Sequence, residues 1–293
     1  MKNIKWMIQS TGFNTSYLQE VAFALEKLKL PFEDYGIIED TVTNLENIFS
    51  GDVDVLIARG GTKLLRIIEG LKNVEDFKRL NGFLSDEQLT NYEKNIKLLK
   101  SSIDYDEERF DQRFYQDMVP VLNDDSSFFT VESLLYSEFE NDYFVKPSKD
   151  AKSFNGGVIY AGETLNNYLM RTPHRNIEEI SQEIVLVAPL REIQNEYRFF
   201  MYKDRILGCS QYMVKGKVQV DPFVPDNVRN TAEMLGSLYN PADIYVVDLC
   251  TFEESNDIRI VEYNCWNCSG FYACDIKNIL NEITKIKKGN INV

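Results

Sequence analysis

The sequence FVKPSKDAKSFNGG occupies residues 144–157, and its first residues predict a buried strand that closes at Lys146. Burial of an ammonium group without a partner is costly, so an anion is the natural partner of this lysine. The loop that follows is polar, ends in two glycines, and supplies Lys149, Lys152, Ser153 and several main-chain N–H groups. Lysines combined with main-chain amides are suited to binding a polyphosphate. The stretch therefore favours a phosphate-binding loop, and the alternative is an ordinary hairpin turn.

Polar side chains also mark the ends of later predicted strands. Glu196 and Arg198 are two residues apart, so they share one face of their strand. The alternative to a functional role is an exposed surface ion pair. Asp248 closes an apolar run, where an uncompensated carboxylate is disfavoured. Glu262 and Asn264 close the next strand and point to one face. Together Asp248, Glu262 and Asn264 offer oxygen ligands that suit Mg²⁺, and the alternative is three ordinary strand-end polar residues.

The composition limits the classes of function. The chain has 293 residues, with 32 Lys and Arg against 46 Asp and Glu, so its formal charge is −14. A surface that binds nucleic acid needs clustered cations, so nucleic acid is not an expected partner. The single histidine argues against His-rich metal sites and against a Ser–His–Asp triad. The chemistry is therefore expected to depend on carboxylates, lysines, arginines or thiols.

The expected location is the cytoplasm, with no membrane partner. No stretch approaches the roughly 20 consecutive apolar residues that a membrane span requires, and no secretory signal is visible at the start.

The number of cysteines is odd, five, which favours reduced thiols in the cytoplasm. Cys265 and Cys268 have the spacing of a redox or zinc pair, but such a zinc site would normally need a second pair. Packing as small apolar residues is the preferred interpretation of this pair.

The fold class is predicted to be α/β. Strands and helices alternate in the first third of the chain, which is typical of a parallel sheet covered on both faces. Strands joined by short turns dominate later, which indicates antiparallel pairing. The expected early strands span residues 4–9, 32–38 and 53–58; a charge-rich helical segment spans 73–118; the strand-rich part begins at 126; and a closing amphipathic helix spans 275–287.

In order and combination, these features resemble the ATP-grasp superfamily. The matching features are Lys146, the glycine-rich loop, Gln182-Glu183, Glu196-x-Arg198, Asp248 and Glu262-x-Asn264. The stretch from Val261 to Tyr272 most resembles a phage-rich clade of uncharacterised ATP-grasp domain proteins. The resemblance implies an N-terminal Rossmann-like domain with a helical extension, residues 1–120. It implies a two-lobed ATP-grasp domain with antiparallel sheets for residues 121–293.

The resemblance also implies roles for single residues. Lys146 would contact the α- and β-phosphates of ATP, and Arg198 would face the γ-phosphate, where positive charge stabilises the transferring group. Arg59, which ends a buried strand, is a candidate for binding an acidic acceptor, and a surface arginine beside a turn is its alternative. Further nucleotide contacts would come from the lid and from the hinge, whose Glu183 would reach the adenine amino group. The lid would close over the β- and γ-phosphates and spans residues 153–157, with Ser153, Asn155, Gly156 and Gly157 as nucleotide contacts. The other nucleotide contacts are Lys149, Lys152, the hinge residues Gln182, Glu183, Ile184 and Val185, and Glu196. The Mg²⁺ ligands are Asp248, Glu262 and Asn264.

The function implied by this resemblance is that of an ATP- and Mg²⁺-dependent ligase. It would join a carboxylate to an amine or thiol through an acyl phosphate, with a small molecule or peptide as acceptor. One alternative is a kinase of the same fold that phosphorylates a hydroxyl. The other is a non-catalytic nucleotide-binding or interaction module. Positioning and charge neutralisation dominate phosphoryl transfer, so the lack of a catalytic histidine is no obstacle.

Overall fold

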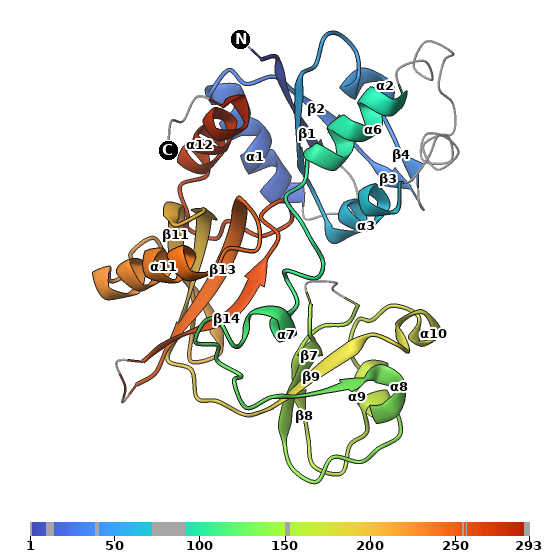
Figure 1. Ribbon diagram of the computed structural model, residues 1–293, viewed down its shortest axis with the longest axis vertical. Coiled ribbons are helices and arrows are strands. Elements are labelled where there is room, and N and C mark those ends of the chain that lie inside the picture. Colours follow the sequence, from blue (N-terminus) through green and yellow to red (C-terminus); the bar gives the residue numbers. More distant parts are fainter. Residues whose placement is uncertain are drawn as a thin grey trace. The chain divides into compact units, whose positions relative to one another are not determined.

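The computed structural model describes residues 2–9, 15–38, 41–71, 92–149, 153–253, 255 and 257–289. The chain forms two compact units: Met1–Tyr105 with Trp266–Val293, and Asp106–Cys265 (Figure 1). The predicted domain boundary after residue 120 stays a prediction. Among the described residues, no helix is both long and apolar enough to cross a membrane.

The first unit contains the predicted parallel sheet. Its strands β1 (Ile4–Gln9), β2 (Phe32–Tyr35) and β5 (Val55–Arg59) lie in the order β2-β1-β5, and all pairs are parallel. The strands are rich in buried apolar residues because helices cover both faces of such a sheet. The helices of this unit are α1 (Thr15–Lys27), α2 (Leu45–Ile48), α3 (Thr62–Gly70), α6 (Tyr92–Ser101) and α12 (Ile276–Lys288), and a small ladder joins β3 (Ile37–Ile38) to β4 (Thr41–Val42).

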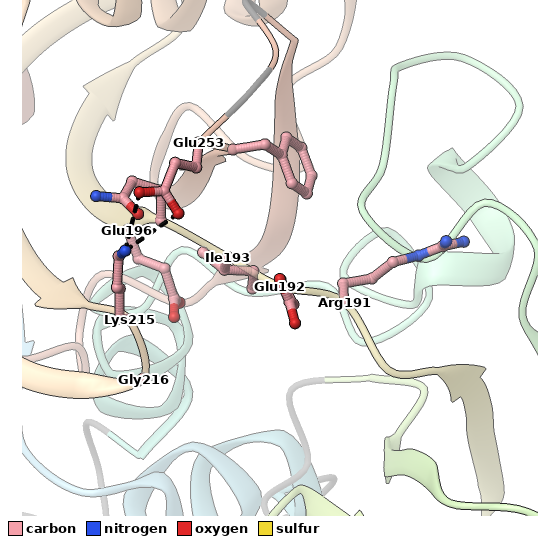
Figure 2. A pocket seen from close by; sticks show the side chains of 9 residues that line it. Arg191, Glu192, Ile193, Glu196, Lys215, Gly216 and Glu253 are labelled. Atoms are coloured by element: carbon pink, nitrogen blue, oxygen red, sulfur yellow. Dashed lines mark hydrogen bonds and ion pairs between the residues drawn. The ribbon is translucent and has the colours of Figure 1, made fainter.

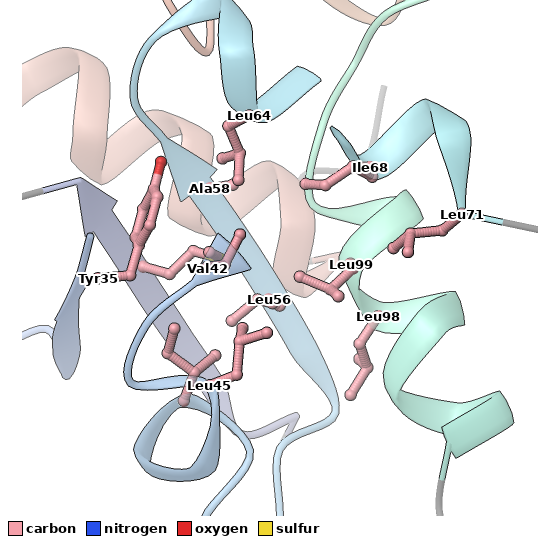
Figure 3. Packing of buried hydrophobic residues seen from close by; sticks show 12 residues of the cluster. Tyr35, Val42, Leu45, Leu56, Ala58, Leu64, Ile68, Leu71, Leu98 and Leu99 are labelled. Atoms are coloured by element: carbon pink, nitrogen blue, oxygen red, sulfur yellow. The ribbon is translucent and has the colours of Figure 1, made fainter. Parts of the chain in front are cut away.

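The core of the first unit lies between the sheet and helices α2, α3 and α6 (Figure 3). Leu56 and Ala58 of β5 pack with Leu64 of α3 and Leu99 of α6. On the other face, Trp6 of β1 donates its indole N–H to Thr284 of α12 at 3.3 Å. The helical prediction for 73–118 is met in part, by α6 and by α7 (Gln112–Tyr115). Residues 102–111 and 116–118 form turns and irregular chain, and residues 73–91 lie outside the described chain.

The second unit holds two antiparallel sheets, as predicted. In the first lobe the strand order is β6-β9-β7-β8, with short helices packed on the sheet. Its strands are β6 (Ser127–Thr130), β7 (Tyr143–Pro147), β8 (Gly157–Ile159) and β9 (Ile184–Pro189), and its helices are α8 (Val131–Leu134), α9 (Leu165–Met170) and α10 (Ile177–Ile180).

The second lobe follows a short linker, residues 190–194, and its strand order is β12-β11-β10-β13-β14. Helix α11 (Asp226–Leu238) packs against β11 and β13. The strands are β10 (Asn195–Tyr202), β11 (Arg205–Val214), β12 (Lys217–Asp221), β13 (Ile244–Thr251) and β14 (Ile258–Asn264). This arrangement confirms the predicted fold class: a parallel sheet followed by a two-lobed part with antiparallel sheets.

Candidate functional site

Lys146 and Glu262 connect the two lobes of the second unit. Lys146 lies near the end of β7 and is buried, with 8% of its surface exposed. Its Nζ donates to Oε2 of Glu262 on β14 at 3.2 Å and to the main-chain oxygen of Val261 at 3.4 Å. Lys146 therefore has an anionic partner within the protein. That partner is Glu262, which is also a predicted metal ligand, whereas the sequence pointed to a phosphate.

Arg198 and Asp248 form a second, more deeply buried pair. They are directly opposite each other in the antiparallel β10–β13 ladder. Arg198 donates Nε to Oδ1 of Asp248 at 2.8 Å and Nη2 to Oδ2 at 2.6 Å. Their side chains are 10% and 1% exposed, so this is a bidentate charge-assisted interaction largely shielded from water.

Asn264 joins the two ion pairs. Its Nδ2 donates to Oδ2 of Asp248 at 3.2 Å and to Oε1 of Glu262 at 3.0 Å. The register explains this proximity, because Asp248 pairs with Glu262 across β13 and β14. We call the group formed by Lys146, Arg198, Asp248, Glu262 and Asn264 the ion cluster. All five of its members were singled out from the sequence.

Glu196 lies beside the ion cluster on β10. It is 8% exposed and accepts a hydrogen bond from the Tyr212 hydroxyl at 2.5 Å. Burial raises the pKa of Glu196, and the charges of Asp248 and Glu262 raise it further, whereas the Tyr212 hydrogen bond lowers it. The hydrogen bond from Tyr212 thus stabilises the charged form of Glu196 against burial and the neighbouring carboxylates.

A cavity of about 760 Å³ adjoins Glu196 (Figure 2). Lys215 and Glu253 are paired at one end of the view, with Nζ and Oε1 3.0 Å apart, and Arg191 lies at the other end. The interlobe linker, the start of β10, the β11–β12 turn and the residues after β13 all contribute to its lining. The lining residues are Arg191, Glu192, Ile193, Gln194, Glu196, Lys215, Gly216, Phe252 and Glu253.

The end of the glycine-rich loop packs against Lys146. A Cβ atom at Gly156 would lie 2.9 Å from Cβ of Lys146, and one at Gly157 would lie 2.6 Å from the hydroxyl of Tyr168. That hydroxyl donates to the main-chain oxygen of Asn155 at 2.8 Å. Both positions therefore need glycine for close approach of the loop to its neighbours.

A sequence profile described as ATP-grasp domain, R2K clade family 3, matches residues 79–283, which is most of the chain. The chain belongs to this family. A search of curated proteins finds no match for this ATP-grasp chain. The association with phages stays a prediction.

Solved structures share the fold over nearly the whole ATP-grasp chain. D-Alanine–D-alanine ligase from Bacillus anthracis, complexed with ATP, has a TM-score of 0.58 at 13% identity, covering 99% of this chain and 100% of the ligase. D-Alanine–D-alanine ligase from Helicobacter pylori has a TM-score of 0.50 at 14% identity, covering 98% and 99%. The ATP-grasp ligase PsnB, with a phosphomimetic variant of a minimal precursor, Mg and ADP, has a TM-score of 0.50 at 11% identity, again covering 98% and 99%. At these identities the likeness concerns the fold alone.

The residues predicted to form the hinge lie at the start of β9 and directly before it. Ile184 and Val185 lie inside β9, and Val185 is fully buried. Glu183 forms an ion pair with Arg175, and Gln182 donates to Oε2 of Glu132 at 2.6 Å. The segment that passes between the lobes is the linker 190–194, several residues later. Binding of adenine by Gln182, Glu183, Ile184 and Val185 stays a prediction.

The remaining residues of the glycine-rich loop have separate contacts. Lys149 pairs with Glu107. Ser153 and Phe154 are buried, with Phe154 in the core of the first lobe, so apolar packing anchors this end of the loop. Lys152 lies outside the described residues.

Arg59 has structural contacts in the first unit, and its predicted contact with an acidic acceptor stays a prediction. It is fully buried, and its guanidinium donates to the main-chain oxygens of Trp266 and Ser269. Its Cζ lies 4.4 Å from the centre of the Phe271 ring. These contacts fix the segment that follows Asn264 in sequence, and they leave the guanidinium inaccessible to a carboxylate from solvent.

The oxygen donors of the ion cluster suit a hard cation. Among the described residues, no three His, Cys, Asp or Glu side chains gather as a metal-binding group, so the donor set is two carboxylates with one amide. Magnesium commonly takes one or two protein carboxylates and completes its shell with phosphate oxygens and water. Asp248, Glu262 and Asn264 therefore fit Mg²⁺ as a set, provided that the Asn264 amide rotates to present its oxygen. No disulfide forms in the described chain, and the pair Cys265 and Cys268 is no exception.

Proposed function

We propose that this protein is an ATP-dependent ligase that joins a carboxylate to an amine through an acyl phosphate. Family membership supports the use of ATP, and the shared fold includes ligases of two kinds, D-alanine–D-alanine ligase and PsnB. The observation that carries the proposal is the ion cluster. It places a lysine, an arginine and two carboxylates from two lobes within direct contact.

The cluster and the adjoining cavity suggest how a nucleotide would bind. Lys146 and Arg198 would bind the phosphates, which are the only strongly anionic part of ATP. The cavity beside Glu196 would take the adenosine, with the linker 190–194 supplying main-chain groups to the base. Glu196, between the cavity and the cluster, would accept hydrogen bonds from the sugar hydroxyls. Carboxylates commonly bind ribose in this way.

Binding would exchange partners within the cluster. Lys146 and Arg198 now neutralise Glu262 and Asp248, so each must leave a carboxylate to reach a phosphate. A carboxylate that loses its cation in a buried site needs another. Mg²⁺ held by Asp248, Glu262 and Asn264 would supply the compensating charge and polarise the γ-phosphate. We therefore expect nucleotide and metal to bind cooperatively.

The reaction would proceed in two balanced steps. An oxygen of the substrate carboxylate attacks the γ-phosphorus, and the bond to the ADP oxygen breaks. The amine nitrogen then attacks the acyl carbon, loses a proton, and inorganic phosphate leaves. Arg198 would stabilise charge on the transferring group, and Lys146 would orient the remaining phosphates. The formal charge of −14 favours cationic amines or basic peptides as acceptors through electrostatic steering.

Calorimetry with ATP in millimolar Mg²⁺ tests the first part of this proposal without assuming an acceptor. The second part is tested by ADP release with pooled amines and acids, followed by mass analysis of the products. A ligase releases inorganic phosphate and forms an amide, whereas a kinase leaves phosphate on the acceptor. Absence of ATP binding by the wild type would exclude both enzymes.

Gly156→Ala is expected to weaken ATP binding without unfolding the protein. The new methyl group would press on the stem of Lys146 and shift its ammonium group, because the 2.9 Å separation leaves no room. We expect the dissociation constant for ATP·Mg²⁺ to rise about tenfold, which corresponds to about 1.4 kcal/mol. Gly70→Ala is the matched control, because nothing lies within 4 Å of its added methyl. Equal affinities for the two variants would show that the loop does not position Lys146.

A further inference from the structure

Strand β11 contains a β-bulge at Tyr212. Tyr197 of β10 pairs with Gln211 and its neighbour Glu196 pairs with Met213, so Tyr212 is the extra residue between them. A bulge interrupts the regular alternation of a strand and can redirect one side chain, and bulges are common beside active sites. The bulge thus places a large aromatic side chain next to the two charged residues of β10.

Tyr212 contacts both of these charged residues. Its hydroxyl donates to Oε2 of Glu196 at 2.5 Å, and Cζ of Arg198 lies 5.4 Å from the centre of its ring. The residue is buried, with 6% of its surface exposed. Burial raises the pKa of Tyr212 well above its usual value, so the hydroxyl remains a donor at neutral pH. A guanidinium group at this distance from an aromatic ring gains a cation–π interaction.

The hydroxyl and the ring of Tyr212 contact different residues. The hydroxyl orients the carboxylate of Glu196, which borders the cavity. The ring of Tyr212 lies beside Arg198 and supports its guanidinium. Removing the hydroxyl alone should therefore affect Glu196, and removing the ring should affect Arg198 as well.

We propose that Tyr212 is a positioning residue of the nucleotide site. Its hydroxyl fixes Glu196 for the hydroxyl groups of the nucleotide sugar, and its ring fixes Arg198 for the phosphates. This inference rests on the proposed function, and it adds a residue on β11 that controls selectivity for a ribonucleotide.

Two substitutions separate the hydroxyl from the ring. Tyr212→Phe keeps the ring, and Tyr212→Leu removes both groups. The probes are ATP, 2′,3′-dideoxy-ATP and inorganic tripolyphosphate, each with Mg²⁺ and measured by calorimetry. We expect Tyr212→Phe to bind ATP about tenfold more weakly, as for loss of a hydrogen bond to a charged group, and to bind the other two probes as the wild type does. Tyr212→Leu should bind all three probes more weakly.

Tyr245→Phe is the matched control. It also removes a buried tyrosine hydroxyl, one that donates to the main-chain oxygen of Lys203 at 2.8 Å, and it should leave all three affinities unchanged. A merely structural Tyr212 would lower the affinities for ATP and dideoxy-ATP equally, and that result would overturn the inference. Unchanged ATP binding by Tyr212→Phe would also overturn it. If the wild type binds no ATP, both the proposed function and this inference are wrong. Equal losses for ATP and dideoxy-ATP, or unchanged ATP binding by Tyr212→Phe, would contradict this inference alone and leave the proposed function unaffected. Tyr212→Phe decides the outcome even if Tyr212→Leu does not fold.

Discussion

Glu262→Gln should abolish ATP turnover while the protein stays folded. The substitution keeps the volume of the side chain and its ability to accept from Asn264, but it removes one negative charge from the donor set. Mg²⁺ must give up water to bind, and a neutral amide compensates this loss poorly. Without Glu262 the positive charge of Mg²⁺ would be lost from the transferring group, and removal of one such stabilising group typically lowers kcat by about 10²–10³-fold. ADP release under saturating ATP, together with thermal unfolding, measures both effects. Asp248→Asn should act in the same direction but more mildly if that residue binds only one of two ions.

Glu163→Gln provides the comparison for this experiment. Glu163 is also paired with a cation, Arg171, at 2.8 Å, but it lies in the turn between β8 and α9 and is not a member of the ion cluster. Its removal should change the free energy of unfolding by about 0–1 kcal/mol and leave turnover unchanged. If Glu262→Gln binds ATP·Mg²⁺ and turns it over as the wild type does, Glu262 is not a metal ligand and its role is to pair with Lys146.

The ion cluster could be predicted from the sequence because its members are polar residues in otherwise apolar strands. Such residues must find partners when the strands are buried. Asp248, predicted to close its strand, lies in the middle of β13, and the antiparallel register places it opposite Arg198 and Glu262. Lys146 illustrates the limit of this reasoning. The sequence required an anion near it, and Glu262 fills that place in the protein alone. Sequence reasoning pointed to the phosphate and did not foresee that the cluster is neutralised internally.

The start of β9 is not evident from the sequence. Helix α10 (Ile177–Ile180) precedes this strand, and the side chain of Asn176 caps the helix by accepting from the main-chain N–H of Glu178. Asn followed by acidic residues is a signal for a helix start that the apolar pattern obscured. Correct placement of this helix would have moved the linker towards residues 190–194.

Arg59 and Tyr212 could not be assigned from local sequence. The partners of Arg59 are carbonyl groups more than two hundred residues later in the chain, and no local pattern indicates them. The position of Tyr212 depends on a bulge, which is a property of the register between two strands. Period-2 alternation predicts which face a residue occupies, but it does not reveal where the ladder slips.

Arg198→Met should be the most destabilising change at the site. It removes the bidentate partner of Asp248, whose side chain is 1% exposed. The carboxylate of Asp248 then stays buried without its cation, although Asn264 still donates to it. Breaking a buried ion pair by removing one partner costs about 3–5 kcal/mol. Chemical denaturation in the presence of EDTA measures this loss. Arg171→Met, which breaks the exposed pair with Glu163, should cost about 0–1 kcal/mol in the same experiment.

Millimolar Mg²⁺ should restore part of the stability that Arg198→Met loses. With Arg198 absent, Asp248 and Glu262 keep two negative charges beside one remaining cation, Lys146, so the donor set attracts a divalent ion more strongly than in the wild type. A ligand that binds only the folded state raises its stability in proportion to RT ln(1 + [L]/Kd). The increase in the free energy of unfolding on adding Mg²⁺ should therefore be larger for Arg198→Met than for the wild type. For Arg171→Met the increase should equal that of the wild type. Equal gains in all three proteins would mean that Mg²⁺ does not bind beside Asp248, and the metal assignment would then have to be abandoned even if the protein binds ATP.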